Sequence, residues 1–410
     1  MVLNRVWIGM FVVAILVGFY KFTFDHQLEI FDQMVTALFE AAKAAFDLAI
    51  GMTALLCLWM GLMKIGEDSG AVTVMAKAVN PLFSRLFPEI PRNHPAMGSI
   101  MLNFSANMLG LDNAATPAGL RAMQQLQDIN PDKETASNAQ IMFLVLNASG
   151  LTIIPVSIIS LRMSAGSEHP TSVFIPILLT TYFATIGGLI FVAIRQKINL
   201  LNGVVLAYIG GITLFIAGLL TFLTFRPDLI EITSKILSSV IIFGFITFFI
   251  AMSLINKVQA FESFVDGAKG GFQVALNIMP FLVAMLAAIS LFNSCGALHD
   301  LIWGIKQVLI FVGVHTTEFI DALPVMLMKP FSGSGARGLM AQNMAQFGPD
   351  SFVSNLSATF QGSTETTFYV LSVYFGSVGI KKTRYAATAG LFCDLVGAVA
   401  AVLIAYLFFS

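Results

Sequence analysis

Long apolar runs alternate with short polar segments along most of the chain. A run of about 20 apolar residues can cross a bilayer as a helix. Candidate spans lie at 6–22, 46–65, 139–161, 173–194, 203–223, 236–255, 274–292 and 385–408. Shorter stretches that contain polar residues or helix breakers lie at 97–111, 298–314, 319–331, 351–360 and 365–380. Backbone that leaves the helix at membrane depth needs protein around it, so these stretches predict broken or re-entrant helices.

The overall composition places the chain in a bilayer. It has 410 residues, of which 57% are hydrophobic and 11% charged, whereas soluble domains carry about 25% charged residues. The net charge of -1 provides no basic surface for nucleic acid. Three scattered cysteines predict neither a disulfide framework nor a metal site. We interpret the first apolar run as a retained anchor or first span, with a signal peptide as the alternative.

The second half of the chain repeats the order of turns and breaks in the first, which predicts an internal duplication. The matched positions are Phe46 with Phe272, Gly70 with Gly296, Met123 with Met340, and Ser137-Asn138 with Ser354-Asn355. Three apolar segments between 173 and 255 separate the copies, and an odd number of crossings inverts the second copy. Inverted repeats are common in carriers that bind their substrate at the midplane. Chance similarity among apolar segments is the alternative.

These patterns predict an all-α polytopic membrane protein with two inverted repeats and broken or re-entrant helices. Residues 1–45 form an N-terminal span and connecting segment, and residues 46–195 form the first repeat. Residues 196–269 form connecting spans, and residues 270–410 form the second repeat.

Polar residues interrupt the second repeat at two places. Two glycines and a proline at 330–335 favour a break that contains Ser332 and Ser334. The run 362–367 places small hydroxyl residues before and after Glu365, which predicts the start of a half-helix with an acid in its first turn. A buried carboxylate in lipid is costly. We therefore expect Glu365 to bind a polar ligand, a proton or a cation.

The first repeat has matching breaks that are rich in amides. Asn107 precedes the break at 111–117 and Asn113 lies within it, and Asn147 and Ser149 lie where the second repeat has its Glu365 run. Asp112 aligns with Lys329, which suggests an ion pair between the repeats, although helix-end positions at the membrane interface are the simpler interpretation. For the hydroxyl residues, close helix packing is the competing explanation.

The motifs resemble a known family. Residues 46–195 resemble spore maturation protein A through the run 97–120, MGSIMLNFSANMLGLDNAATPAGL. Residues 236–410 resemble spore maturation protein B through 330–335 and 361–374. The chain thus resembles a fusion of the two, with a nucleoside-recognition, or Gate, domain in each half.

More distantly, the Gate domains are similar to concentrative nucleoside transporters, in which a Gly-Gln-Thr-Glu hairpin contacts the nucleoside. The resemblance implies that Thr364 and Glu365 contact a ligand. Ser363 replaces the glutamine here, so recognition of a base edge does not carry over.

Together these features predict a non-enzymatic, transporter-like protein of the bacterial inner membrane. It would bind a small polar solute, such as a nucleoside-like molecule, or a lipid-linked precursor between the repeats. No cofactor is expected, although Na⁺ or H⁺ coupling fits the breaks, and a homodimer follows from the resemblance to carriers. The candidate solute contacts are Asn107, Asn113, Asn147, Ser149, Ser332, Ser334, Ser363, Thr364, Glu365, Thr366 and Thr367.

Two other functions stay open. The first is a non-transporting membrane protein that acts in cell-envelope or spore-cortex assembly or in sensing. The second, an intramembrane hydrolase, needs a base beside Ser334 or Ser363, and the sequence identifies none.

Overall fold

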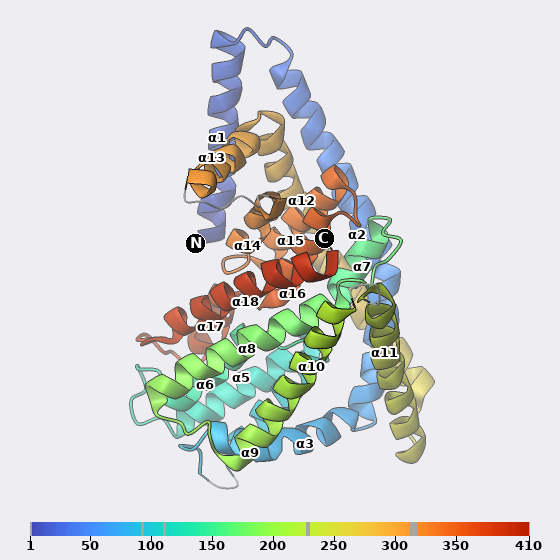
Figure 1. The fold of residues 1–410 in the computed structure, drawn as a ribbon, viewed down its shortest axis with the longest axis vertical. Coiled ribbons are helices and arrows are strands. Elements are labelled where there is room, and N and C mark those ends of the chain that lie inside the picture. Colours follow the sequence, from blue (N-terminus) through green and yellow to red (C-terminus); the bar gives the residue numbers. More distant parts are fainter. Residues whose placement is uncertain (1, 92–93, 110–111, 227–229, 312–317, 410) are drawn as a thin grey trace.

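The computed structural model describes residues 2–91, 94–109, 112–226, 230–311 and 318–409. In these ranges the chain is a bundle of helices with no strand (Figure 1). Five of the helices are long and apolar enough to cross a membrane, namely Trp7–Phe24, Ile30–Asp68, Phe174–Gln196, Gly203–Leu223 and Ala386–Phe409. The prediction of an all-α polytopic membrane protein is confirmed.

The first helices run from the N-terminus to the middle of the chain. They are α1 (Val2–Phe24), α2 (Ile30–Asp68), α3 (Ala71–Leu86), α4 (Pro95–Met108), α5 (Asp112–Asp128), α6 (Asn138–Ala148), α7 (Val156–Ser164) and α8 (Phe174–Gln196). The connecting part contains α9 (Gly203–Val205), the π-helical turn η1 (Leu206–Gly210), α10 (Gly211–Phe225) and α11 (Ile230–Ile255).

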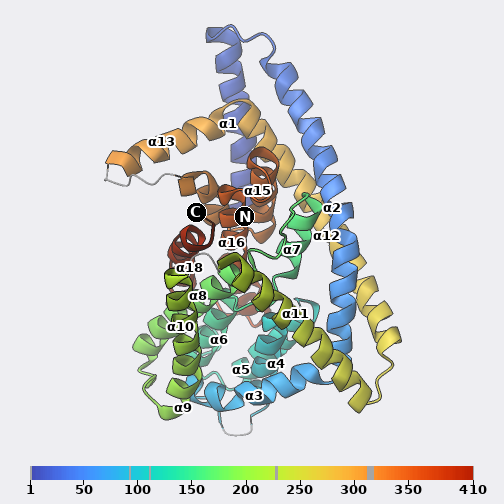
Figure 2. The same cartoon turned by 45° about the vertical axis from the view of Figure 1, so that its right-hand side comes forward.

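The second half contains a similar series. Its elements are α12 (Ala260–Ser294), α13 (Ala297–Phe311), the 3-10 turn η3 (Glu318–Ala322), α14 (Leu323–Met328), α15 (Gly333–Phe347), α16 (Phe352–Ser363), α17 (Thr367–Ser377) and α18 (Ala386–Phe409). Figures 1 and 2 show α1 and the first part of α2 as a hairpin that extends beyond the rest of the molecule.

The order of elements from α2 to α8 matches the order from α12 to α18. Each series has a long helix, a left-handed glycine turn at Gly70 or Gly296, further helices, and a pair of short helices before the last long one. The duplication and its inversion stay predictions, which this order supports. The boundaries predicted before residues 46 and 270 fall inside α2 and α12.

One predicted span is wrong. The run 139–161 is not a continuous helix, because α6 ends at Ala148 and α7 begins at Val156. Between them Gly150 adopts a left-handed conformation with φ +58°, which a residue without Cβ adopts readily. Pro155 directly precedes α7.

Matched long helices pack antiparallel to one another. In α2 and α12, Ser290 donates to the Ala37 carbonyl, while near the other ends Gly271 lies against Leu56. A Cβ on Gly271 would lie 2.5 Å from the Leu56 carbonyl oxygen, and Gly267, one turn earlier, faces the Met60 carbonyl in the same way. Small residues allow this approach in membranes, where hydrophobicity alone drives no helix pairing.

The pair α8 and α18 has the same antiparallel arrangement (Figure 1). Gln196 at the end of α8 donates to the hydroxyl of Tyr385, which directly precedes α18, at 2.9 Å. Further along, Gly188 of α8 faces Cys393 of α18. Antiparallel pairing of matched helices is the relation that an inverted repeat would produce.

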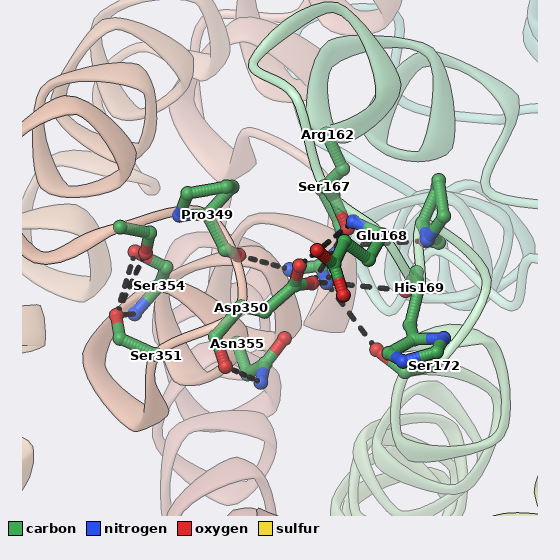
Figure 3. Close-up of polar contacts among 12 residues, drawn as sticks. Arg162, Ser167, Glu168, His169, Ser172, Pro349, Asp350, Ser351, Ser354 and Asn355 are labelled. Carbon is green, nitrogen blue, oxygen red and sulfur yellow. Dashed lines mark hydrogen bonds and ion pairs between the residues drawn. The ribbon is translucent and has the colours of Figure 1, made fainter.

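A buried arginine joins the two halves at the start of α8 (Figure 3). Arg162 of α7 is fully buried, and its Nη2 lies 2.8 Å from Oδ1 of Asp350, which precedes α16. The Asp350 carboxylate also accepts hydrogen bonds from the Ser167 hydroxyl at 2.6 Å and the Glu168 N–H at 2.8 Å. The other acceptors of Arg162 are the carbonyls of Pro170, His169 and Pro349 and the hydroxyls of Ser167 and Ser172.

Both charges of this pair persist at neutral pH. Burial lowers the pKa of Arg162 to about 10, although Asp350 opposes the shift. Burial alone would raise the pKa of Asp350, but the hydrogen bonds from Ser167 and Glu168 and the charge of Arg162 outweigh it. The pKa of Asp350 is therefore below its usual value.

A second junction lies at the opposite end of α8. The N–H groups of Lys381 and Lys382 donate to the Glu134 carbonyl, and Ala136 donates to the Lys382 carbonyl. Arg384 donates to the Ala136 carbonyl at 3.1 Å. With 23 residues in α8, the two junctions are separated by roughly 35 Å. Each half therefore holds the other at both ends of the bundle.

We predict that Gly271→Ala destabilises the fold. The added Cβ must push α2 and α12 apart, and overpacking of this kind costs about 1–3 kcal/mol. Thermal unfolding of the purified protein in lipid nanodiscs measures the change. Gly244→Ala in α11 is the matched control, because nothing lies within 4 Å of a Cβ there. Equal melting temperatures for the two variants would contradict the close crossing.

We also predict that Asp350→Asn lowers stability by about 1–3 kcal/mol at pH 7, because buried donors of Arg162 lose a charged acceptor. Since the pKa of Asp350 is lowered in the folded state, this contribution is present above the unfolded pKa, near about 4. It is lost as pH falls through the lower folded pKa. Melting curves of both proteins should therefore converge below about pH 4.

The control for this prediction is Glu134→Gln at the other junction. The ion pair of Glu134 with Lys381 is 57% and 72% exposed, so its loss should change stability by at most about 1 kcal/mol. A gap between Asp350→Asn and the wild type that stays constant down to acidic pH would show that the ionised carboxylate is not the stabilising group.

Candidate solute-binding site

Two interrupted helices meet at the centre of the molecule. The Glu365 N–H, just past the end of α16, donates to the carbonyl of Ala148, the last residue of α6, at 2.9 Å. A Cβ on Gly150 would lie 2.9 Å from the Glu365 nitrogen. Glu365 and Ala148 are counterparts in the predicted repeat, so the equivalent breaks of the two halves are in direct contact.

The break around Glu365 is not the helix start that the sequence predicted. Helix α16 continues through Gly362 to Ser363, and Thr364 and Thr366 are extended before α17 begins at Thr367. Gly362 serves packing instead, because a Cβ there would lie 2.7 Å from Ile177 and 2.9 Å from Ile158. The hydroxyls that could cap a helix bind elsewhere: Thr364 and Thr367 donate to Asp394 of α18.

A cavity of about 310 Å³ adjoins these breaks, and both halves line it. Pockets for small molecules occupy about 300–1,000 Å³, so this cavity suits a small solute. The polar residues that line it from the first half are Asn107, Thr116, Asn147, Thr152 and Ser157. Those from the second half are Lys329, Arg337, Gln361, Thr364, Glu365, Thr366, Tyr369 and Tyr374.

Amides from two helices and a tyrosine hydroxyl from a third form a connected network beside the cavity. Asn107 donates to Oδ1 of Asn147 at 2.8 Å, and the Tyr374 hydroxyl donates to the same oxygen at 3.3 Å. Asn103 donates to the Ala115 carbonyl at 2.8 Å and lies 3.3 Å from the Tyr374 hydroxyl. Because α4, α6 and α17 each contribute, the network fixes the relative positions of the two halves at the cavity.

The Glu365 side chain is exposed in the cavity wall, rather than buried as the sequence argument assumed. Tyr369, one turn further along, is 60% exposed and lines the same cavity. Lys329 is only 6% exposed, and Arg337 is half-buried nearby. A carboxylate, two cations and several amides thus surround a space that can hold hydrogen-bonding groups.

Comparison with known proteins finds relatives of both parts of the chain. A family model described as nucleoside recognition (Gate) matches residues 49–165. Spore maturation protein A of Bacillus subtilis (strain 168) is 38% identical over 187 residues, which cover 46% of this chain and 92% of that protein. Spore maturation protein B of the same organism is 44% identical over 156 residues, which cover 38% of this chain and 85% of that protein.

The chain belongs to the spore maturation protein A and B family. Each relative accounts for less than half of it, so the chain combines both types, as the sequence motifs predicted. No solved structure matches.

In this member of the family, five of the predicted site residues line the cavity: Asn107, Asn147, Thr364, Glu365 and Thr366. Five others form structural contacts. Ser149 and Ser363 donate to carbonyls at the ends of their own helices, and Thr367 binds Asp394. Ser332 caps α15 through the Gly335 N–H and lies 3.2 Å from Ser334. The side chains of Asn113 and Asp112 lie outside the described residues.

Asp394 was not among the predicted site residues, although its carboxylate accepts hydrogen bonds from Thr364 and Thr367. Asp394 interrupts the apolar run 386–409, in which it is the only charged residue. That isolation in a span was a usable signal, since acids in membrane helices usually have a function. Tyr374 was missed because nothing in its local sequence distinguishes it from a packing residue.

We predict that Gly150→Ala disrupts the contact between the two breaks. The new Cβ would occupy a left-handed residue and press against the Glu365 backbone. Gly166→Ala is the matched control, because Gly166 has φ +83° but nothing within 4 Å of its Cβ. The strain from positive φ is common to both, so we expect Gly150→Ala to cost about 1–3 kcal/mol more. Equal thermal stability of the two variants would argue against the contact.

Proposed function

We propose that this protein is a transporter-like protein of the bacterial inner membrane that binds a small polar solute between its two halves. The observation that carries the proposal is the cavity at the junction of the interrupted helices, lined by polar groups from both halves. Interrupted helices that meet at such a cavity are the usual design of substrate sites in secondary carriers.

The chemistry of the lining supports a solute rich in hydrogen-bonding groups. Asn107 and Asn147 supply amides, Glu365 supplies an acceptor, and Lys329 and Arg337 supply positive charge. A nucleoside-like molecule offers donors and acceptors that complement these groups. The match of residues 49–165 to a family model described as nucleoside recognition supports this substrate class. A lipid-linked precursor with a polar head is the second substrate class.

The contacts between the halves support alternating access as the mechanism. The halves contact each other at both ends of α8. At the cavity they meet through the Glu365 backbone bond to Ala148 and through the hydrogen bonds of Tyr374 with Asn103 and Asn147. Rocking of one half against the other around the breaks would open the cavity to either side, with Na⁺ or H⁺ as the coupling ion.

The alternative is a non-transporting protein of envelope or spore-cortex assembly or sensing, which the names of the relatives favour. A dry, packed contact around Glu365 would favour this alternative, whereas Glu365 is exposed in a cavity. A hydrolase has less support. Among the described residues, Ser334 forms a side-chain hydrogen bond only with Ser332, and Ser363 only with the Phe360 carbonyl.

We predict that a bound solute raises the thermal stability of the purified protein. A ligand at one hundred times its dissociation constant adds about 2.7 kcal/mol. The panel contains nucleosides, nucleobases and envelope precursors, with Na⁺ and pH varied. Glu365→Gln should remove the response to the true solute because the cavity loses its acceptor charge, whereas Glu262→Gln, at an exposed carboxylate of α12, should keep it.

Uptake of the same solute into proteoliposomes then separates the two functions. Accumulation that is lost in Glu365→Gln supports the carrier. Stabilisation without uptake would instead support a sensing role. A response that Glu365→Gln leaves intact would remove Glu365 from the binding site.

A further inference from the structure

Asp394 is a partly buried carboxylate in a membrane-spanning helix, directly behind the cavity wall. Helix α18 carries no other charged residue. An ionised carboxylate in this setting is costly and needs partners. The side chain does not line the cavity itself, so a direct solute contact does not explain it.

The partners of Asp394 are the two threonines that bracket the break. Thr364 donates to Oδ1 at 2.7 Å, and Thr367 donates to Oδ2 at 2.8 Å. Glycines on the same face of α18 make room for both: a Cβ on Gly397 would lie 3.0 Å from Thr364, and one on Gly390 would lie 2.5 Å from Thr367. Because Gly390, Asp394 and Gly397 lie on one face of α18, this face accommodates the two threonines and binds their hydroxyls.

The charged groups that reach Asp394 are few. Lys329 attracts its carboxylate and Glu365 repels it. Helices α6, α8, α16 and α17 pack against α18. Three of them carry no acidic, basic or histidine side chain, and the only charge of α8 is Arg195 at its far end. Besides its burial and its two threonine partners, Asp394 therefore interacts electrostatically with Lys329 and Glu365, both of which line the cavity.

We propose that Asp394 binds the proton that couples to solute movement in the proposed carrier. A hydronium ion transfers its proton to one carboxylate oxygen: an O–H bond forms on Asp394, the O–H bond of the hydronium breaks, and neutral water leaves. The resulting O–H is a donor, so Asp394 can no longer accept hydrogen bonds at both oxygens in the same way. The protonated oxygen is a weaker acceptor than a carboxylate oxygen, so its hydrogen bond with the threonine hydroxyl weakens or reverses direction.

This change acts directly on the cavity. Thr364 is the residue before Glu365, and Glu365 is held to the other half only by its backbone bond to Ala148 among the hydrogen bonds described. Neutralising Asp394 also removes the repulsion that it exerts on Glu365. Proton binding by Asp394 is thereby linked to the position of Glu365 in the cavity wall. That this link drives solute movement rests on the proposed function.

The test is infrared difference spectroscopy of the full chain in lipid nanodiscs, acidified from about pH 8 to about pH 5. The wild type should gain the carbonyl band of a protonated carboxylic acid. Asp394→Asn should lose this band, and Glu365→Gln should keep it. A band that survives in Asp394→Asn, or disappears only in Glu365→Gln, would overturn the assignment of the proton to Asp394.

A second pair of variants keeps the test valid if Asp394→Asn fails to fold. Thr364→Val and Thr367→Val each remove a donor that favours the ionised form, so the band should appear at higher pH. Thr366→Val is the matched control, because Thr366 lies in the same break and, among the hydrogen bonds described, donates none to Asp394. An unchanged midpoint in both donor variants would contradict the proposal.

The proton site and the carrier can fail separately. The infrared band requires no solute, whereas the thermal panel and the uptake assay do. A band that depends on Asp394, without any solute response, would support the proton site and contradict the carrier function. A solute response without such a band would keep the carrier and overturn this inference.

Discussion

Backbone groups freed where a helix stops inside a bilayer must find partners within the protein, and this constraint determines the centre of the molecule. The Glu365 N–H reaches the Ala148 carbonyl, so the end of one interrupted helix supplies the acceptor for the next. In the first half the Ile153 N–H reaches the Met108 carbonyl, and in the second the Phe368 N–H reaches the Pro330 carbonyl. The polar cavity follows from these contacts, because the breaks bring side chains from both halves to one place.

The two halves contribute different chemistry to that place. The first half provides Asn107 and Asn147, which are neutral and hold one another through hydrogen bonds. The second half provides the charges, with Lys329 and Glu365 at the cavity and Asp394 behind it. The cavity lining therefore combines neutral amides of the first half with charged side chains of the second.

Packing by small residues makes these approaches feasible. Gly271 brings α12 against α2, and Gly390 and Gly397 bring α18 against the threonines of the break. In lipid the helices gain little from hydrophobic burial against each other, so close backbone contact and polar bonds provide the specificity. At the ends of the bundle, Arg162 with Asp350 and the loop of Arg384 join the halves by charge and backbone contacts.

The sequence by itself determined the membrane class, five of the spans, the presence of polar breaks and the family, because hydropathy and motifs are local properties. Since polar groups in apolar runs stand out, it also marked candidate residues, of which Asn107, Asn147, Thr364, Glu365 and Thr366 line the cavity. Their contact with a solute stays a prediction. Only the tertiary structure decided that α16 continues past Gly362, that Ser149 and Ser363 donate to carbonyls of their own helices, and that Asp394 accepts the hydrogen bonds of the two threonine hydroxyls. Those outcomes depend on contacts between segments that are far apart in the chain. The local sequence around the breaks does not specify that Ile177, Gly397 or Tyr374 packs beside them.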